Sequence, residues 1–291
     1  VRDADTAMYR AKGAGRSRSE VFDSSMYQNA IAALNMEVEL AEAIKQGQIV
    51  PYYQPIVSLE SGRIAGFEAL ARWHHPERGL ISPGRFIPLA EETGLIVPLG
   101  EQIMASAIGQ ACEWRRTHRP QDDLMIGVNL SVTQFTHPEL EAQISSAIEA
   151  SDMRPGCVKL EITESSLMGD VDRSMQLLSR LKALEIQLGI DDFGTGYSSL
   201  SYLHRFPFDI LKVDQSFVGQ MEREAESREI VTSIVSLAHG LEKQVIAEGI
   251  ESPAQLTALR TLGSEYGQGF LFSKPVPAGE AGDLLSRDPQ W

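Results

Sequence analysis

The chain has 291 residues, of which 43% are hydrophobic, and its formal net charge at pH 7 is −14. This composition excludes a disordered chain, and the length suits one α/β barrel with some additional elements. No apolar run reaches 18 residues, so no segment is predicted to span a membrane. The acidic balance, without a basic stripe, excludes long nucleic acid as a partner. An anionic ligand would therefore need metal ions to supply much of the positive charge.

The beginning of the chain carries its own signals. Residues 3–12 are predicted to be helical, with Gly13 and Gly15 as stop signals. The start VRDADTAMYRAK does not begin with Met and lacks the apolar core of a signal peptide. We therefore expect a cytoplasmic fragment of a longer polypeptide, and leave open whether that parent is membrane-anchored. Cys112 and Cys157 lie far apart without C-x-x-C spacing, which predicts two buried thiols in a reducing compartment.

A second amphipathic helix is predicted over 26–46, and short apolar strands then alternate with helical segments. The predicted strands are 50–58, 63–71, 124–130, 157–163, 186–191, 209–214, 243–249 and 265–271. The predicted helices between them lie near 99–117, 137–150, 171–184, 225–240 and 253–262. This alternation predicts an α/β fold, a closed TIM-like (β/α)8 barrel rather than an open sheet. The Ser-Gly turn in SLESGR allows a hairpin, so one strand is expected to be antiparallel.

Polar side chains mark the C-terminal ends of most of these strands. They are Glu68, Asn129, Glu161, Glu164, Asp191, Asp192, Lys212, Asp214, Glu248, Glu251 and Gln268. Barrel enzymes build their active sites at this end of the strands. Any single member, such as Glu248 before Gly249, is more simply interpreted as a loop acid in a turn. Several carboxylates converging on one mouth would repel one another without cations among them, so the whole set indicates a functional site.

The types of side chain also indicate which ion would bind. Carboxylate and amide oxygens favour Mg²⁺ or Mn²⁺ over Zn²⁺, because neither cysteine nor histidine joins the set. We interpret His74 and His75, which come before a proline, as loop-packing residues. The turn FGTG after Asp191 and Asp192 can direct both carboxylates at the mouth. One of them could then bridge two ions about 3.5–4 Å apart, the usual spacing for phosphoryl displacement.

Several motifs in the chain resemble those of a known family. YYQPIV, GFEALARWHHP, VNLS, LEITES, DDFGTGYSSLSYL, FDILKVD, IAEGIE and GQGFLFSKP occur in order from about residue 35 onward. They resemble the EAL domain, a family that linearises cyclic di-GMP. ADTAMYRAKGAGRSR is similar to the last helix of a GGDEF domain, whose signature is absent from the chain. The resemblance implies a GGDEF remnant at 1–21, a linker with a first helix at 22–48, and the phosphodiesterase barrel at 49–291. It also implies GGDEF and sensor domains upstream in the parent chain.

The resemblance assigns roles to single positions. It implies that one ion is bound by Glu68, Asn129, Glu161 and Asp191. Asp191 and Asp192 would bind the second ion, with Glu248 reaching a metal directly or through a water. Lys212 matches the lysine at the nucleophilic water, so the implied catalytic residues are Glu248, Lys212 and Asp192. Glu164 and Glu251 match acids that anchor loops or support the site. The implied substrate contacts are Gln54, Leu70, Arg72, Asn129, Asp214 and Gln268.

The resemblance therefore implies hydrolysis of cyclic di-GMP to linear pGpG with two Mg²⁺ or Mn²⁺ ions, and inhibition by Ca²⁺. It also implies a homodimer formed through the segment at 193–203. Two other interpretations stay open. One is a non-catalytic receptor with this fold, and the other is an unrelated barrel hydrolase such as a glycosidase. A glycosidase needs only two carboxylates, which would leave Asn129, Lys212 and the Asp191–Asp192 pair unexplained.

Overall fold

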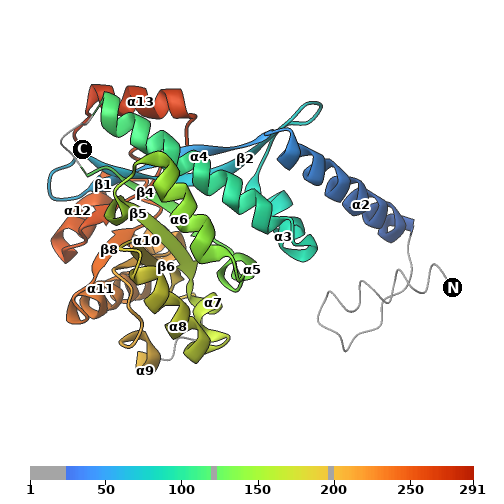
Figure 1. Ribbon diagram of the computed structural model, residues 1–291. Helices are drawn as coiled ribbons and strands as arrows, with labels where there is room; N and C mark the ends of the chain where they lie inside the picture. Colours follow the sequence, from blue (N-terminus) through green and yellow to red (C-terminus); the bar gives the residue numbers. More distant parts are fainter. Residues whose placement is uncertain (1–23, 119–122, 196–199) are drawn as a thin grey trace.

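The structure is a computed structural model that describes residues 24–118, 123–195 and 200–291 (Figure 1). The predicted helix at 3–12 lies outside these residues. The strands are β1 (Ile49–Ser58), β2 (Ile64–His75), β3 (Gly79–Ile81), β4 (Met125–Leu130), β5 (Val158–Thr163), β6 (Gln187–Phe193), β7 (Ile210–Val213), β8 (Gln244–Ala247) and β9 (Tyr266–Gly267). The longer helices are α2 (Ser24–Lys45), α3 (Pro83–Thr93), α4 (Ile96–Thr117), α6 (Leu140–Ser151), α8 (Val171–Lys182), α11 (Ala225–Gly240), α12 (Pro253–Leu262) and α13 (Ala278–Arg287). Short helices are α5 (Val132–Phe135), η1 (Pro155–Cys157), α7 (Glu164–Met168), α9 (Leu200–Leu203) and α10 (Gln215–Gln220).

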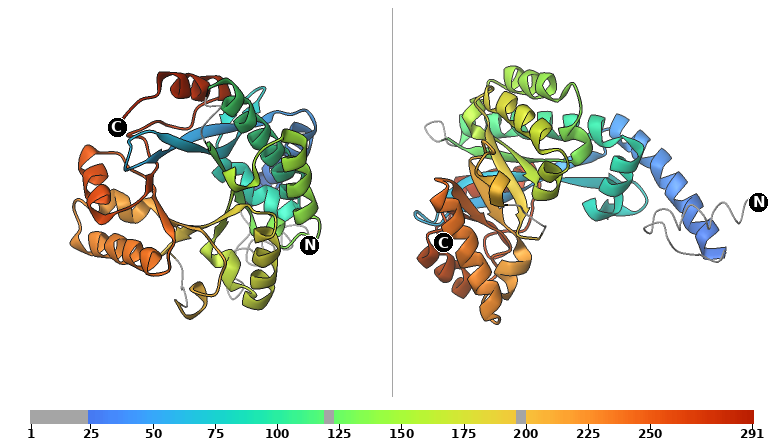
Figure 2. Two further views of the ribbon diagram at one scale, coloured as in Figure 1. Left: turned by 60° about the vertical axis from the view of Figure 1, so that its left-hand side comes forward. Right: turned by 90° about the horizontal axis from the view of Figure 1, so that it is seen from below.

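Eight of the strands close into a ring. Their order is β1-β9-β8-β7-β6-β5-β4-β2, and pairing of β1 with β2 completes the barrel. β1 runs antiparallel to both β2 and β9, whereas the successive pairs from β2 through β4 to β9 are parallel. Figure 2 shows this ring end-on with helices around its outside. The prediction of a TIM-like barrel with one antiparallel strand is confirmed.

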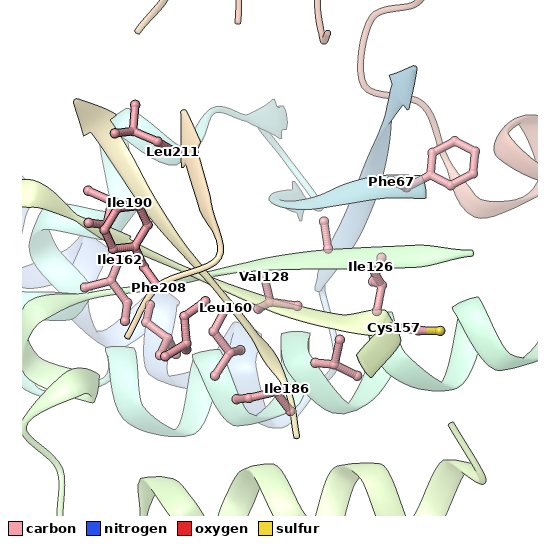
Figure 3. Close-up of a cluster of buried hydrophobic side chains, with 14 of the residues drawn as sticks. Phe67, Ile126, Val128, Cys157, Leu160, Ile162, Ile186, Ile190, Phe208 and Leu211 are labelled. Atoms are coloured by element: carbon pink, nitrogen blue, oxygen red, sulfur yellow. The ribbon is translucent and has the colours of Figure 1, made fainter. Parts of the chain in front are cut away.

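Alternation along each strand separates the core from the barrel interior. On β5, Leu160 and Ile162 belong to the main hydrophobic cluster, while Lys159 and Glu161 alternate with them. Successive side chains of a strand point to opposite faces, so the apolar set packs outward beneath the helices and the charged set points into the barrel. Phe67, Ile126, Val128, Ile190 and Leu211 belong to the same outward layer (Figure 3). The core therefore fixes which residues point toward the functional site.

The sequence did not predict a smaller lobe beside the barrel. β2 continues to His75 instead of ending at 71, and it pairs there with β3. α2 and α3 complete the lobe, and α2 projects away from the barrel (Figure 1). The lobe has its own cluster, which includes Leu40, Ile49, Trp73, Phe86 and Leu99. A three-residue strand is too short for alternation to reveal, and Pro88 inside α3 resembles a helix breaker.

Two smaller predictions also need correction. His74 and His75 belong to the end of β2 and not to a loop. His75 is buried, and its Nδ1 accepts hydrogen bonds from the backbone N–H groups of Glu77 and Arg78, at 3.1 and 3.2 Å. The last strand is much shorter than the predicted 265–271, because the chain after β9 bonds instead to the loop that follows β8.

Cys112 and Cys157 are both buried free thiols, as expected. In the part of the chain that the structure describes, no helix combines the length and apolar character needed to cross a bilayer.

Candidate active site

A pocket of about 320 Å³ opens at the C-terminal ends of the barrel strands. It is lined by Gln54, Glu68, Leu70, Asn129, Asp191, Lys212, Gln215, Glu248, Gly249, Glu251, Gln268, Gly269 and Phe270. A larger hollow of about 920 Å³ lies at the opposite end of the strands, where Arg63, Asp123, Arg154 and Glu185 contribute charges of both signs. Only the first pocket gathers the acids and amides that the sequence placed at strand ends, so it is the candidate site.

Lys212 is the centre of this pocket. Its side chain on β7 is 1% exposed, and its Nζ lies 2.6 Å from both Glu161 Oε2 and Glu248 Oε1. Asp191 Oδ1 is 3.2 Å away and Glu68 Oε2 is 3.6 Å away. Burial alone would lower the pKa of this ammonium, but the surrounding carboxylates raise it well above its ordinary value. Lys212 therefore stays charged and links four acids that come from four different strands or strand ends.

A second buried lysine lies deeper in the barrel. Lys159 is 0% exposed, and its Nζ lies 2.6 Å from Glu161 Oε1, an ion pair whose angles are not those of a hydrogen bond. Burial would raise the pKa of Glu161, but Lys159 and Lys212 together lower it to about 2. Glu161 is therefore ionised between two ammonium groups. Sequence reasoning missed Lys159, because a lysine within a strand is usually taken to point into solvent.

The other acids of the site show an excess of negative charge. Burial is the main cause of the raised pKa of Glu68, and the nearby carboxylate of Glu161 raises it further. The ammonium of Lys212 lowers this pKa, but not enough to cancel the two effects. Burial is also the main reason that the pKa of Glu248 rises to about 8, with Asp191 and Glu68 adding to the effect. Burial raises the pKa of Asp192 too, and Asp191 adds to that shift. The two lysines do not balance these carboxylates, so the mouth favours additional cations.

The oxygen donors of the pocket suit the divalent ions that the resemblance implies. Glu68, Asn129 and Asp191 offer carboxylate and amide oxygens in one pocket, which is the chemistry that Mg²⁺ and Mn²⁺ prefer. Within residues 24–118, 123–195 and 200–291, no three acidic, cysteine or histidine side chains are arranged so that they could hold a metal ion together. Lys212 occupies the centre, where its single positive charge faces four acids. The residues fit divalent cations by type and charge.

Amide side chains connect the site across the point where the ring closes. Asn129 Nδ2 donates to Glu68 Oε1 at 2.5 Å, and Gln268 Nε2 donates to Glu68 Oε2 at 2.6 Å. Gln268 Nε2 also donates to Gln54 Oε1 at 2.9 Å. The remaining Gln268 Oε1 is buried without a hydrogen-bond partner among the described residues. A buried acceptor without a partner is costly, so this oxygen is available to a ligand donor or a cation.

Asp191 and Asp192 are placed differently, although they are neighbours. Asp191 is buried in the pocket lining, whereas Asp192 is exposed and has a positive φ of 53°. The β6–β7 register shifts between Ile190 and Phe193, so a bulge lies at this pair. Bulges next to active sites redirect side chains, and Asp191 still lies close enough to Asp192 to help raise the pKa of its carboxyl group. Glu164 Oε2 accepts a hydrogen bond from the backbone N–H of Gly194 at 3.1 Å, which anchors the chain after the bulge.

Five predicted residues do not line the pocket, namely Arg72, Glu161, Glu164, Asp192 and Asp214. The Nη1 of Arg72 donates to Ala71 O at 2.9 Å and its guanidinium lies 5.8 Å from the ring centre of Tyr52. Asp214 caps α10 by accepting from the backbone N–H of Ser216 at 3.0 Å. Glu251 lines the pocket but is exposed.

Some lining residues were not among those predicted. The most informative are Gln215, Gly249 and Phe270, whose side chain is 54% exposed although it is a large aromatic. Gly249 has a φ of 70°, and a Cβ there would lie 2.6 Å from Gln215 Cβ, so the turn after Glu248 requires glycine. The GQGF motif shows that a phenylalanine follows Gln268 closely in the sequence. The sequence does not show that its ring is exposed beside a polar pocket.

A closed barrel with acids, amides and a buried lysine at its C-terminal mouth defines an α/β-barrel protein with an acidic pocket where barrel enzymes place their active sites. The model of the EAL domain family matches residues 37–275. The chain belongs to the EAL domain family.

Relatives and solved structures agree with this assignment. The chain is 43% identical over 276 residues to the bifunctional diguanylate cyclase/cyclic di-GMP phosphodiesterase MucR of Pseudomonas aeruginosa, covering 95% of this chain and 40% of MucR. It is 39% identical over 278 residues to the cyclic di-GMP phosphodiesterase PdeR of Escherichia coli, covering 96% of this chain and 42% of PdeR. The chain thus spans less than half the length of these relatives. The solved PaMucR phosphodiesterase in complex with c-di-GMP superposes with a TM-score of 0.82 at 41% identity, covering 85% of this chain and 99% of that one.

Proposed function

We propose that this chain is a metal-dependent phosphodiesterase that hydrolyses cyclic di-GMP to linear pGpG and so lowers the level of this second messenger. The observation that carries the proposal is the cluster of acids around Lys212 at the mouth of an EAL-family barrel. The names of MucR and PdeR support the substrate. The c-di-GMP complex of the PaMucR phosphodiesterase supports it as well.

The proposed cofactors are two Mg²⁺ or Mn²⁺ ions. The residues that would hold them are Glu68, Asn129, Glu161, Asp191, Asp192 and Glu248. When bound, such ions neutralise phosphoryl oxygens and make a water more acidic. Ca²⁺ is expected to bind but to inhibit, because its coordination is longer and looser than the octahedral geometry of Mg²⁺.

Lys212 and Glu248 are the residues proposed to act on the attacking water, with Asp192 close by. The ammonium of Lys212 already contacts Glu248 Oε1, so it can hold the water and the carboxylate together. Glu248 accepts the proton from the water as the water oxygen attacks phosphorus, a role that requires its ionised form, which Lys212 at 2.6 Å and bound cations would favour. The P–O3′ bond then breaks, and the 3′ oxygen leaves with its electron pair and takes a proton from solvent, which opens the ring to pGpG with a free 3′-hydroxyl.

The proposed substrate contacts surround this centre. Gln54, Leu70 and Gln268 line the pocket, and the exposed ring of Phe270 offers a flat surface for a guanine base. Arg72 would leave its contact with Ala71 O to bind a phosphate with its planar fork. Asn129 and Asp214 complete the proposed set.

We further propose a homodimer formed through 193–203. Residues 196–199 of this segment lie outside the described residues. Its two ends support the idea, because Glu164 holds the backbone of Gly194 and Tyr202 is 38% exposed. Glu164 would then couple the dimer contact to Asp191 and Asp192. In the longer parent, we propose a GGDEF remnant at 1–21 with GGDEF and sensor domains upstream.

The direct test is incubation of the purified chain with cyclic di-GMP and Mg²⁺, with and without EDTA, followed by chromatographic identification of products. The proposal expects pGpG in the presence of Mg²⁺ and unchanged substrate with EDTA. Stoichiometric binding without turnover would instead support the non-catalytic receptor. Glycoside hydrolysis that EDTA does not affect would support the other barrel hydrolase.

A further inference from the structure

Lys159 is a buried cation that the proposed reaction does not use. It lies on β5 two residues before Glu161, so it points into the barrel one layer below the mouth. It is fully buried and does not line the pocket. Burying an ammonium group is costly unless a partner compensates for it. Its ion-pair partner is Glu161, at 2.6 Å.

The neighbouring strands leave space for this pair. Gly127 on β4 is in register with Lys159, and Gly189 on β6 is in register with Glu161. A Cβ at Gly127 would lie 2.8 Å from Glu161 Oε1 and 3.0 Å from Lys159 Cε. A Cβ at Gly189 would lie 3.6 Å from Glu161 Cγ and 3.8 Å from Lys159 Cδ. The glycine at 127 is therefore needed for the lysine and the carboxylate to meet.

The two oxygens of Glu161 consequently face different partners. Oε2 lies 2.6 Å from Lys212, which also contacts Glu68, Asp191 and Glu248 at the mouth. Oε1 lies 2.6 Å from Lys159, which is below the mouth. While Lys159 holds Oε1, Glu161 has one oxygen left for the mouth.

We infer that Lys159 is a positioning residue that restricts Glu161 to one-oxygen coordination and thereby disfavours Ca²⁺ relative to Mn²⁺ and Mg²⁺. Ca²⁺ takes six to eight oxygens and often binds a carboxylate through both of them, whereas Mg²⁺ uses a compact octahedral shell. The inference rests on the proposed function in one respect, namely that Glu161 is a metal ligand.

Two simpler roles predict different behaviour. If Lys159 acted only through its charge, its removal would strengthen the binding of all divalent ions by a similar factor. If it acted only in folding, its removal would lower the melting temperature without changing the preference between ions. The ratio of the Ca²⁺ and Mn²⁺ dissociation constants therefore separates the positioning role from both.

The test is calorimetric titration of Mn²⁺ and Ca²⁺ into the substrate-free chain and its variants. Lys159→Met keeps a long apolar stem but removes the ammonium. We expect it to shift the ratio of dissociation constants toward Ca²⁺ by about tenfold. Lys182→Met is the matched control, because Lys182 forms its ion pair with Asp209 outside the pocket. This control should keep the wild-type ratio.

Gly127→Ala is a second variant, which disturbs the same contact while keeping both charges. It allows the inference to be tested even if Lys159→Met does not fold. It should shift the ratio of the Ca²⁺ and Mn²⁺ dissociation constants in the same direction. A ratio within about twofold of wild type in each folded variant would overturn the role of Lys159. Failure of the wild-type chain to bind Mn²⁺ would instead overturn the proposed metal site, so the two failures are distinguishable.

Discussion

Replacing Lys212 with Met should reveal the charge balance of the site. The variant keeps the volume but removes the cation that contacts Glu68, Glu161, Asp191 and Glu248. Breaking a buried ion pair from one side costs about 3–5 kcal/mol. In a chain of this size, about 1 kcal/mol shifts the melting temperature by roughly 2 °C. We therefore expect the melting temperature in EDTA to fall by about 6–10 °C.

Divalent ions should reverse much of this loss. A ligand at 100 times its dissociation constant stabilises the folded state by about 2.7 kcal/mol. A mouth without Lys212 attracts cations more strongly, so Mn²⁺ should raise the melting temperature more in Lys212→Met than in wild type. Hydrolysis of cyclic di-GMP should nevertheless fall by about 100-fold or more, because the water and Glu248 lose their shared donor.

Differential scanning fluorimetry in EDTA and in Mn²⁺, combined with product chromatography, measures all three effects. Lys182→Met is the control for loss of a lysine ion pair away from the pocket. A Lys212→Met variant that melts within about 2 °C of wild type in EDTA, or gains no more from Mn²⁺ than wild type does, would refute the reasoning.

Three further predictions concern the neighbouring acids. Asp191→Asn should reduce hydrolysis below about a tenth of the wild-type rate with a near-native melting temperature, as measured by product chromatography and fluorimetry; a higher rate would contradict its bridging role. Because the Glu248 pKa is raised from 4.5 to about 8, the folded chain in EDTA keeps a proton that the unfolded chain releases, and Glu248 makes stability fall as pH rises through that window. Glu248→Gln should therefore flatten the melting temperature between pH 5 and 8, and an unchanged slope would exclude this assignment. Glu164→Gln, which weakens the anchor on Gly194, should increase the monomer fraction in sedimentation velocity at tens of micromolar; an unchanged dimer fraction would disconnect this anchor from assembly.

Local patterns in the sequence were sufficient for the barrel and for the placement of acids and amides at one of its mouths. β5 was predicted at 157–163 and occurs at Val158–Thr163, and α11 was predicted and occurs at 225–240. Apolar periodicity fixes such elements because each strand or helix must bury one face, whatever its neighbours are. Strand direction then carried the acids to one mouth, since the carboxyl ends of parallel strands lie together.

Tertiary structure decided what local patterns do not encode. The contact of Arg72 with the substrate phosphate stays a prediction, and the structure adds that its guanidinium bonds to the backbone of Ala71 and does not line the pocket. Asp191 and Asp192 were expected to share the mouth, and the bulge in β6 leaves Asp191 buried and Asp192 exposed.

The buried lysines show the same division between sequence and structure. Glu161 and Lys212 are 51 residues apart in the chain, and their contact exists because the strands that carry them close into a ring. Lysine is a residue type that is usually found at the protein surface. The glycines on the two adjacent strands give Lys159 space inside the barrel. The sequence by itself therefore determined the fold class and the inventory of reactive groups. Their pairing depended on register and closure between distant strands, which only the tertiary structure sets.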